Sequence, residues 1–184
     1  MIADLLKKTR SYRSFDNSYT VSKETLLSLV ENVRYTASTR NAQALRFALC
    51  YEKEQCAQLL ALTRWAGALP GIQLPPKGQE PAAYIVICAD ADIFTRDVGI
   101  AAQTIMLSAT ELGLGGCMIG SYDGEKVSEL MNIPEPLTPR LILALGMPCE
   151  TVVLEDAKDG KLTYYRDDQN VHHVPKLSVE DMIL

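Results

Sequence analysis

The chain has 184 residues, of which 47% are hydrophobic and 22% are charged, and its formal net charge is −5. This composition is typical of a globular protein that can bury a sizeable core, and the length suits a single domain over residues 1–184. No long basic stretch indicates a nucleic-acid partner, and no apolar run approaches the ~20 residues that span a bilayer. Because residues 1–8 lack the order of a signal peptide, we expect a cytoplasmic protein.

In the first half of the chain, apolar residues recur at helical spacing over residues 1–8, 23–34 and 53–65, which predicts three helices. Ser22 stands where a helix N-cap is expected. A polar turn over residues 38–43 leads into a predicted strand at 46–51. The stretch 70–81 is rich in proline and glycine, and we interpret it as a loop or a lid.

The second half begins with the strand 83–89, whose nearly uninterrupted apolar run implies cover on both faces. The strongest helix follows at 97–112. It is apolar almost all round, which indicates burial in a core or between subunits, and Gly113 supplies its C-terminal cap.

Shorter elements complete the chain. We predict strands at 117–120 and 141–145, a helix at 125–131, a weak strand at 162–165 and a helix at 179–184. Helices and strands alternate, but not as regular βαβ units, so the pattern predicts an α+β fold with a mixed sheet and helices on both of its faces.

The cysteine count is odd, and no two cysteines form a Cys-x-x-Cys pair. Buried, reduced thiols are the favoured interpretation, and we expect no metal, because the only histidines are His172 and His173. The cysteines are Cys50, Cys56, Cys88, Cys117 and Cys149.

Several common catalytic motifs are missing. There is no phosphate-binding Gly-x-x-x-x-Gly-Lys loop and no Gly-x-Ser-x-Gly elbow. The glycine-rich run 113–116 follows a helix and enters a strand, which is the wrong order for a dinucleotide fingerprint. A stable Rossmann site for NAD or FAD is therefore not expected.

Two polar clusters contain side chains that suit ligand binding. Arg10 to Arg13 places two guanidinium groups and hydroxyls within a short turn, which suits a phosphate, although a solvated basic turn is the simpler alternative. Residues 38–43 contain Asn41 and Gln43, whose amides suit a ring with alternating N–H and C=O groups, although an ordinary capped turn is the favoured interpretation of this cluster on its own.

These segments together are similar to the nitroreductase-like FMN flavoproteins. The resemblance spans nearly the whole chain in order, and it is carried by residues 10–15, 38–47, 97–102, 113–121 and 145–148. It departs from the family pattern at Thr9, where many members have arginine, and at Ala44, where a proline is usual.

The resemblance implies a mainly antiparallel central sheet and an intertwined homodimer with FMN at the interface. It assigns the FMN phosphate to Arg10, Ser11 and Lys176, and the N1–C2=O side of the ring to Arg13. Asn41 and Gln43 would bond the ring edge or ribityl chain. Ile119, Gly120 and Ser121 would pass the flavin edge near N5. No side-chain acid or base is required, because N5 of the flavin carries the chemistry.

The implied activity is ping-pong hydride transfer from NAD(P)H to a small acceptor, such as a nitroaromatic compound or a quinone. Three alternatives remain open. One is an FMN protein of this fold with another reaction, such as flavin breakdown or reductive dehalogenation. The others are a flavin-binding or carrier module without turnover, and an α+β domain without a cofactor.

Overall fold

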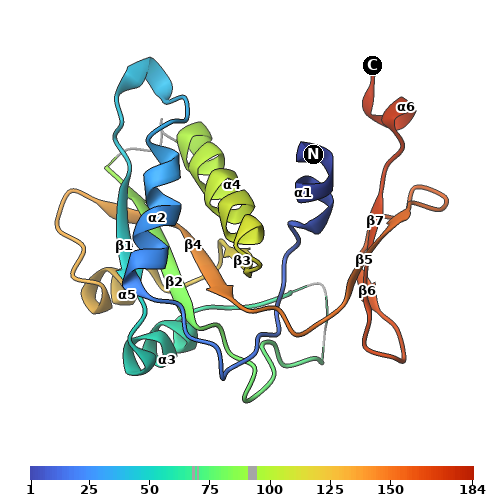
Figure 1. Cartoon of the computed structure of the whole chain (residues 1–184), viewed down its shortest axis with the longest axis horizontal. Helices are drawn as coiled ribbons and strands as arrows, with labels where there is room; N and C mark the ends of the chain where they lie inside the picture. Colours follow the sequence, from blue (N-terminus) through green and yellow to red (C-terminus); the bar gives the residue numbers. More distant parts are fainter. Residues whose placement is uncertain (68, 70, 91–94) are drawn as a thin grey trace.

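The computed structural model describes the whole chain except residues 68, 70 and 91–94. Its centre is a four-stranded antiparallel sheet with the strand order β1-β2-β4-β3 (Figure 1). The strands are β1 (Arg46–Cys50), β2 (Ala83–Ala89), β3 (Gly115–Ile119) and β4 (Thr138–Gly146). Strand β2 is buried along its whole length, which confirms the cover predicted from its apolar run.

Two pairs of helices cover the two faces of this sheet. On one face α2 (Lys23–Val33) and α4 (Thr95–Glu111) pack against Ala83, Ile85 and Ile87. On the other face α3 (Lys53–Ala61) and α5 (Gly124–Leu130) pack against the alternate residues of the same strand, Tyr84, Val86 and Cys88. Successive side chains of a strand point to opposite faces, so one apolar strand serves both layers.

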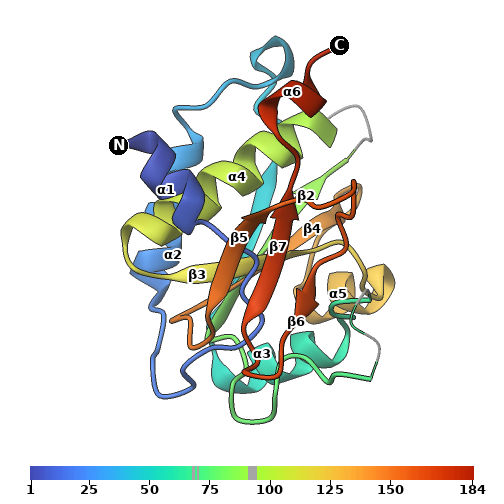
Figure 2. The same cartoon turned by 90° about the vertical axis from the view of Figure 1, so that its right-hand side faces the viewer.

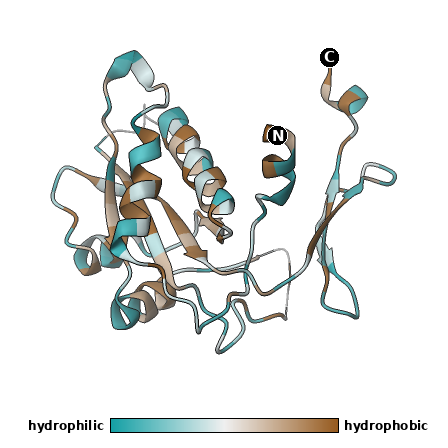
Figure 3. Cartoon of the chain, in the orientation of Figure 1, coloured by the Kyte–Doolittle hydropathy of each residue, from teal (hydrophilic) through white to brown (hydrophobic). Residues whose placement is uncertain are grey.

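The predicted helix caps are confirmed. Ser22 accepts a hydrogen bond from the Thr25 amide at 3.1 Å and starts α2. Gly113 follows α4 with φ = +79°, a backbone conformation that ends a helix and favours glycine. One side of α4 is buried, whereas Ile100 and Leu112 are 39% and 54% exposed. Figure 3 shows that apolar residues continue along this helix.

The C-terminal segment forms a second sheet of three strands, with the order β5-β7-β6. The strands are β5 (Val152–Asp156), β6 (Tyr165–Arg166) and β7 (His172–Lys176); β5 and β7 run parallel. This sheet stands apart from the central one (Figure 1), and α1 (Ile2–Lys8) lies beside α4, to one side of the second sheet in Figure 2. The chain ends after the short helix α6 (Val179–Met182).

Several predicted boundaries were wrong. The helix expected at 53–65 ends at Ala61, and Thr63 instead pairs with Tyr122. The weak strand expected at 162–165 contributes only Tyr165. Strands β5 and β7 were missed because neither shows an apolar alternation: β5 reads Val-Val-Leu-Glu-Asp and β7 reads His-His-Val-Pro-Lys. Helix α6 ends at Met182 rather than at Leu184. Helix α4 and strand β4 begin earlier than predicted, at Thr95 and Thr138.

Residues 71–81 contain turns but no helix or strand, as expected of a loop, while Pro70 lies outside the described residues. All five cysteines are free thiols, and Cys149 is the exposed one. Across the described part of the chain, no helix has the length and apolar character needed to cross a membrane.

Candidate functional site

The segment after α1 runs beside β3 and brings the basic turn to the central sheet. Ser11 forms a parallel bridge with Gly116, and the Tyr12 amide donates to the Gly116 carbonyl at 2.9 Å. A Cβ on Gly116 would lie 2.3 Å from the Ala144 carbonyl oxygen of β4. A Cβ on the neighbouring Gly115 would lie 2.5 Å from Cδ2 of Tyr12, so glycine at position 115 permits the close approach of the segment that carries Arg13.

The side chain of Arg13 is held on three sides. Its Nη1 donates to the Ser11 carbonyl at 3.1 Å and lies 3.2 Å from Nε2 of His172. Its guanidinium also lies over the ring of Tyr164, 5.1 Å from the ring centroid. Arg13 is only 9% exposed, and within the described residues no carboxylate lies within ion-pair distance of its guanidinium. The site thus contains a fixed positive charge that no carboxylate of the described residues pairs with.

His172 is almost completely buried, and its burial and the nearby charge of Arg13 determine its protonation state. Burial and then the charge of Arg13 lower the pKa of His172 to about 4, so the ring is neutral at pH 7. Arg13 has no acceptor atom, so Nε2 of His172 must accept, and Nδ1 must carry the proton. Nδ1 is buried, with no partner among the described residues.

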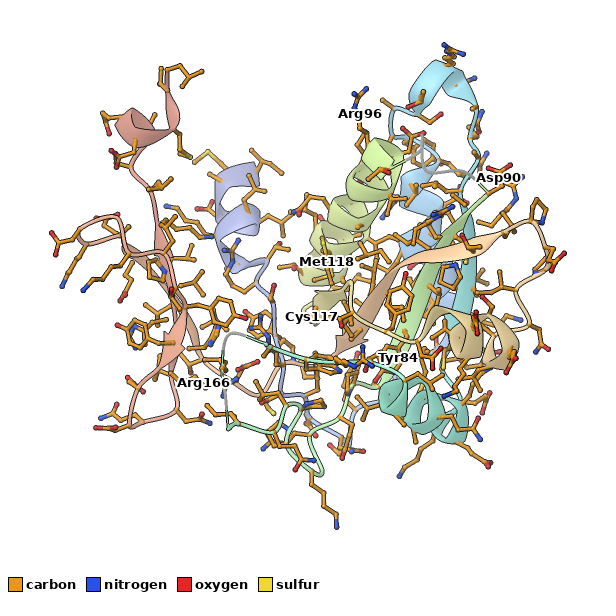
Figure 4. All side chains as sticks on the ribbon, turned by 180° about the vertical axis from the view of Figure 1, so that it is seen from behind. Tyr84, Asp90, Arg96, Cys117, Met118 and Arg166 are labelled. Atoms are coloured by element: carbon orange, nitrogen blue, oxygen red, sulfur yellow. The ribbon has the colours of Figure 1, made fainter. Side chains whose placement is uncertain are left out.

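Glu150 joins the N-terminal segment to the second sheet. Its carboxylate accepts from the backbone amides of Arg13 and of Ser14, the latter at 3.0 Å, and it forms an ion pair with Arg166. Both side chains of this pair are less than 5% exposed. Figure 4 labels Arg166, which comes from β6, together with Cys117 and Met118 of β3.

A cavity of about 260 Å³ opens beside Arg13. Four of the predicted residues line it, namely Arg13, Ile119, Gly120 and Ser121, and Arg64, Trp65 and Tyr164 are also part of its wall. A Cβ on Gly120 would meet no atom within 4 Å, so the space above this backbone is open. The Arg64 amide donates to the Ser121 carbonyl at 2.9 Å and ties the two walls together.

Asn41 and Gln43 line a different cavity, of about 270 Å³, between α2 and β1. Nε2 of Gln43 donates to Oδ1 of Asn41 at 3.2 Å. Both residues have a positive φ, as does Arg40, with values between 46° and 54°. Such a cluster of strained residues is often found at functional sites. The buried carboxylate of Asp97 anchors this loop by accepting from the amide and the hydroxyl of Thr39.

The three predicted phosphate ligands line neither cavity. Arg10 donates to the Leu6 carbonyl at 2.7 Å, and its Nε is buried without a partner in the described residues. Burial lowers the pKa of Arg10, and the nearby Tyr12 opposes that effect. Ser11 and Lys176 are exposed, the latter at the end of β7. Within a single chain, the predicted flavin-binding residues therefore lie in three groups: four at the cavity beside Arg13, two at the cavity between α2 and β1, and three at neither cavity.

Sequence reasoning missed Trp65, Glu150, Tyr164, Arg166 and His172. These residues come from a loop and from the second sheet, where no periodic pattern marks a strand. The only available signals were an aromatic and basic cluster at residues 164–166 and a pair of histidines at 172–173.

Known proteins share both the sequence pattern and this architecture. A model described as the Nitroreductase family matches residues 6–75 and 88–147. An FMN reductase [NAD(P)H] of Bacillus subtilis is 24% identical over 205 residues, which covers 93% of this chain and 78% of the relative.

Two solved structures extend this similarity to the fold. A nitroreductase family protein from Streptococcus pneumoniae covers all of this chain and 99% of its own, with a TM-score of 0.75 and 17% identity. An FMN-dependent nitroreductase from Clostridium difficile matches 87% of this chain and 92% of its own, with a TM-score of 0.66 and 25% identity. The α+β fold with a mainly antiparallel central sheet, expected from the sequence, is confirmed by these neighbours.

Proposed function

Because the chain belongs to the nitroreductase family and is therefore an oxidoreductase, we propose that it binds FMN and uses NAD(P)H to reduce a small acceptor. The acceptor class is nitroaromatic or quinone-like. One observation carries the proposal: Arg13 presents a buried cation, without a carboxylate partner among the described residues, to the cavity beside Gly120. Two similar proteins are named FMN reductase and FMN-dependent nitroreductase, and these names also support FMN as the cofactor.

The residues around this cavity fit the ring of FMN. When bound, FMN supplies the hydride chemistry at its N5. Arg13 would lie beside the N1–C2=O edge, where a fixed cation stabilises the negative charge that reduction adds. Ile119, Gly120 and Ser121 would line the N5 edge, and the open space above Gly120 lets a planar ring approach the backbone. NAD(P)H and the acceptor would use the exposed ring face in turn.

The remaining contacts would come from three further residues and from the second cavity. Arg10, Ser11 and Lys176 would hold the phosphate, and the Nε of Arg10 has no hydrogen-bond partner among the described residues. Asn41 and Gln43 would bond the ring edge or the ribityl chain. The fit supports FMN better than FAD, because the sequence has no fingerprint for an ADP moiety.

A second copy of the chain would complete the site. The two cavities, of about 260 and 270 Å³, are each smaller than the ~300–1,000 Å³ of ordinary ligand pockets. Apolar side chains are exposed on α1, α4 and near α6, among them Ile2, Leu6, Ile100, Met182 and Ile183. A dimer that covers these side chains would bring Asn41 and Gln43 of one protomer toward Arg13 of its partner.

Anaerobic spectroscopy tests the proposal. The purified protein should be yellow, release intact FMN on denaturation, bleach when NAD(P)H is added and recover its colour with a quinone. A protein that stays yellow with NAD(P)H is a carrier, and a colourless protein that takes up no added FMN has no flavin function. Loss of intact FMN during turnover would instead indicate flavin breakdown. A cytoplasmic location also stays a prediction, which fractionation of cells checks.

A further inference from the structure

A third cavity, of about 420 Å³, lies on the α3 side of the central sheet. Its wall includes Tyr19, Tyr51, Cys56, Glu80 and Tyr84, and it contains none of the residues assigned to flavin binding. Figure 4 shows Tyr84 close to α3. The proposed function leaves this cavity unused.

Two thiols meet beside this cavity. The Sγ atoms of Cys50 and Cys56 are 3.5 Å apart, which is hydrogen-bond distance for sulfur. Cys50 ends β1 and is fully buried, while Cys56 lies in α3 and lines the cavity. A disulfide needs an S–S distance of about 2.05 Å. The two sulfurs therefore have to approach by only about 1.5 Å.

Tyr84 brings an unused hydrogen-bond donor to the same place. It is the cross-strand partner of Cys50, so both side chains lie on one face of the sheet. Tyr84 is 1% exposed, and its buried hydroxyl has no partner among the described residues. The hydroxyl therefore has a hydrogen-bonding capacity that no described residue uses.

The hydrogen bond between the thiols makes them unequal. The hydrogen bond to the other thiol raises the pKa of Cys50 and lowers the pKa of Cys56. The thiolate is the nucleophilic form of cysteine. Cys56 lines the cavity, whereas Cys50 is fully buried, so Cys56 is the thiol that reacts first and Cys50 is placed to react with the product.

We propose that Cys56 and Cys50 form a dithiol that a small hydroperoxide, bound in this cavity beside Tyr84, oxidises to a disulfide. The Cys56 thiolate attacks the terminal oxygen of the hydroperoxide, the O–O bond breaks, and Tyr84 donates a hydrogen bond to the leaving oxygen, which takes a proton from solvent. The resulting sulfenic acid on Cys56 is attacked by the sulfur of Cys50, which loses its proton, and water leaves. Overall, two thiols lose two hydrogen atoms, and hydrogen peroxide becomes two molecules of water.

The reaction requires no flavin and no NAD(P)H, so its test is independent of the proposed function. The reduced protein is treated with hydrogen peroxide, and the products are mapped as peptides without reduction. We expect a Cys50–Cys56 disulfide, loss of two of the five thiols and full recovery with dithiothreitol. Absence of this disulfide, or a disulfide to Cys149 in its place, overturns the proposal.

Single substitutions test the order of events. Cys50→Ser should stop at a sulfenic acid on Cys56, which dimedone traps, whereas Cys56→Ser should leave Cys50 unoxidised. The matched control Cys149→Ser removes an exposed thiol and should form the disulfide at the wild-type rate. Equal oxidation of Cys50 in the Cys56→Ser variant contradicts the assignment of Cys56 as nucleophile. If a serine variant does not fold, the corresponding alanine variant and the peptide map of the peroxide-treated wild-type protein test the proposal in its place.

Tyr84→Phe isolates the hydroxyl, since it keeps the ring. Loss of one hydrogen bond corresponds to about a three- to tenfold slower oxidation of Cys56. Tyr51→Phe, on the same cavity wall, should oxidise at the wild-type rate. An unchanged rate in Tyr84→Phe removes Tyr84 from the proposal, and equal slowing in both variants shows that the effect is a general disturbance of the cavity.

Discussion

Nη1 of Arg13 lies 3.2 Å from Nε2 of His172, although 159 residues separate them in the chain. A neutral, buried histidine accepts from the guanidinium and does not neutralise its positive charge. A carboxylate in the same place would neutralise that charge. The pair thus presents a fixed cation to the cavity and links the basic turn at residues 10–13 to strand β7.

The first prediction separates the two arginines of the basic turn. Arg13→Ala should lower the midpoint potential of bound FMN, because one charge contact of about 1.5–3 kcal/mol to the reduced ring is lost. For two electrons, ~30 mV corresponds to ~1.4 kcal/mol, so the fall should be roughly 30–60 mV. Arg10→Ala should weaken FMN binding and leave the potential of the bound flavin nearly unchanged. Redox titration of flavin-saturated protein checks both, and the reverse pattern would show that the two roles are exchanged.

The second prediction concerns pH. The folded-state pKa of His172 is lowered to about 4, against about 6.5 when unfolded. The unfolded state therefore binds the extra proton, so this contribution to stability is complete above pH 6.5 and is lost as the pH falls toward 4. The loss cannot exceed about 1.4 kcal/mol per pH unit for one proton.

Urea unfolding of wild type and His172→Gln between pH 7 and pH 4 measures this effect. Glutamine keeps an acceptor for Arg13 but does not titrate, so the variant should lose less stability with acid. If the free energy of unfolding falls with pH by the same amount in the two proteins, His172 is not the titrating group. His173, beside Asp167 and Glu155, has a raised pKa, and His173→Gln should change the pH dependence in the opposite sense.

The third prediction concerns the buried pair of Glu150 and Arg166. Glu150→Gln leaves a buried guanidinium without its anion and weakens the acceptor for the amides of Arg13 and Ser14, so we expect a loss of about 3–5 kcal/mol in the free energy of unfolding. Glu31→Gln removes the exposed partner of Arg34 and should cost at most about 1 kcal/mol. Equal losses in urea denaturation would mean that burial does not strengthen the first pair.

The fourth prediction compares two glycines of the same region. Gly116→Ala places a Cβ 2.3 Å from the Ala144 carbonyl, and such overpacking should cost about 1–3 kcal/mol of stability. Gly120→Ala meets no protein atom within 4 Å, so it should fold normally but weaken FMN binding by occupying the space above β3. Thermal unfolding without FMN and FMN titration together separate the effects, and normal FMN affinity in Gly120→Ala would show that the flavin binds elsewhere.

The fifth prediction tests the dimer. Light scattering at low micromolar concentration should give twice the mass of the chain. Ile100→Asp, on the exposed side of α4, should shift this equilibrium toward the monomer, whereas Ile72→Asp, a similarly exposed isoleucine in the 71–81 loop, should leave it unchanged. A stable, flavin-loaded wild-type monomer would contradict the shared site.

The sequence alone determined the central layers, because their signals are local. The apolar run of β2 predicted a strand covered on both faces, and Ser22 and Gly113 marked helix ends through their own backbone hydrogen bonding and φ. The ordered motifs indicated the family and pointed to Arg13 and to residues 119–121, which do lie together.

Only the tertiary structure decided what holds Arg13 and where the predicted residues lie relative to one another. Glu150, Arg166 and His172 act through contacts across long stretches of chain, and the strands that carry the last two have no apolar alternation to reveal them. Asn41 and Gln43 resemble flavin ligands in sequence, yet the fold places them in a separate cavity. Local patterns report the burial and backbone conformation of one segment, whereas a site depends on distances between segments, and those are set only when the layers pack.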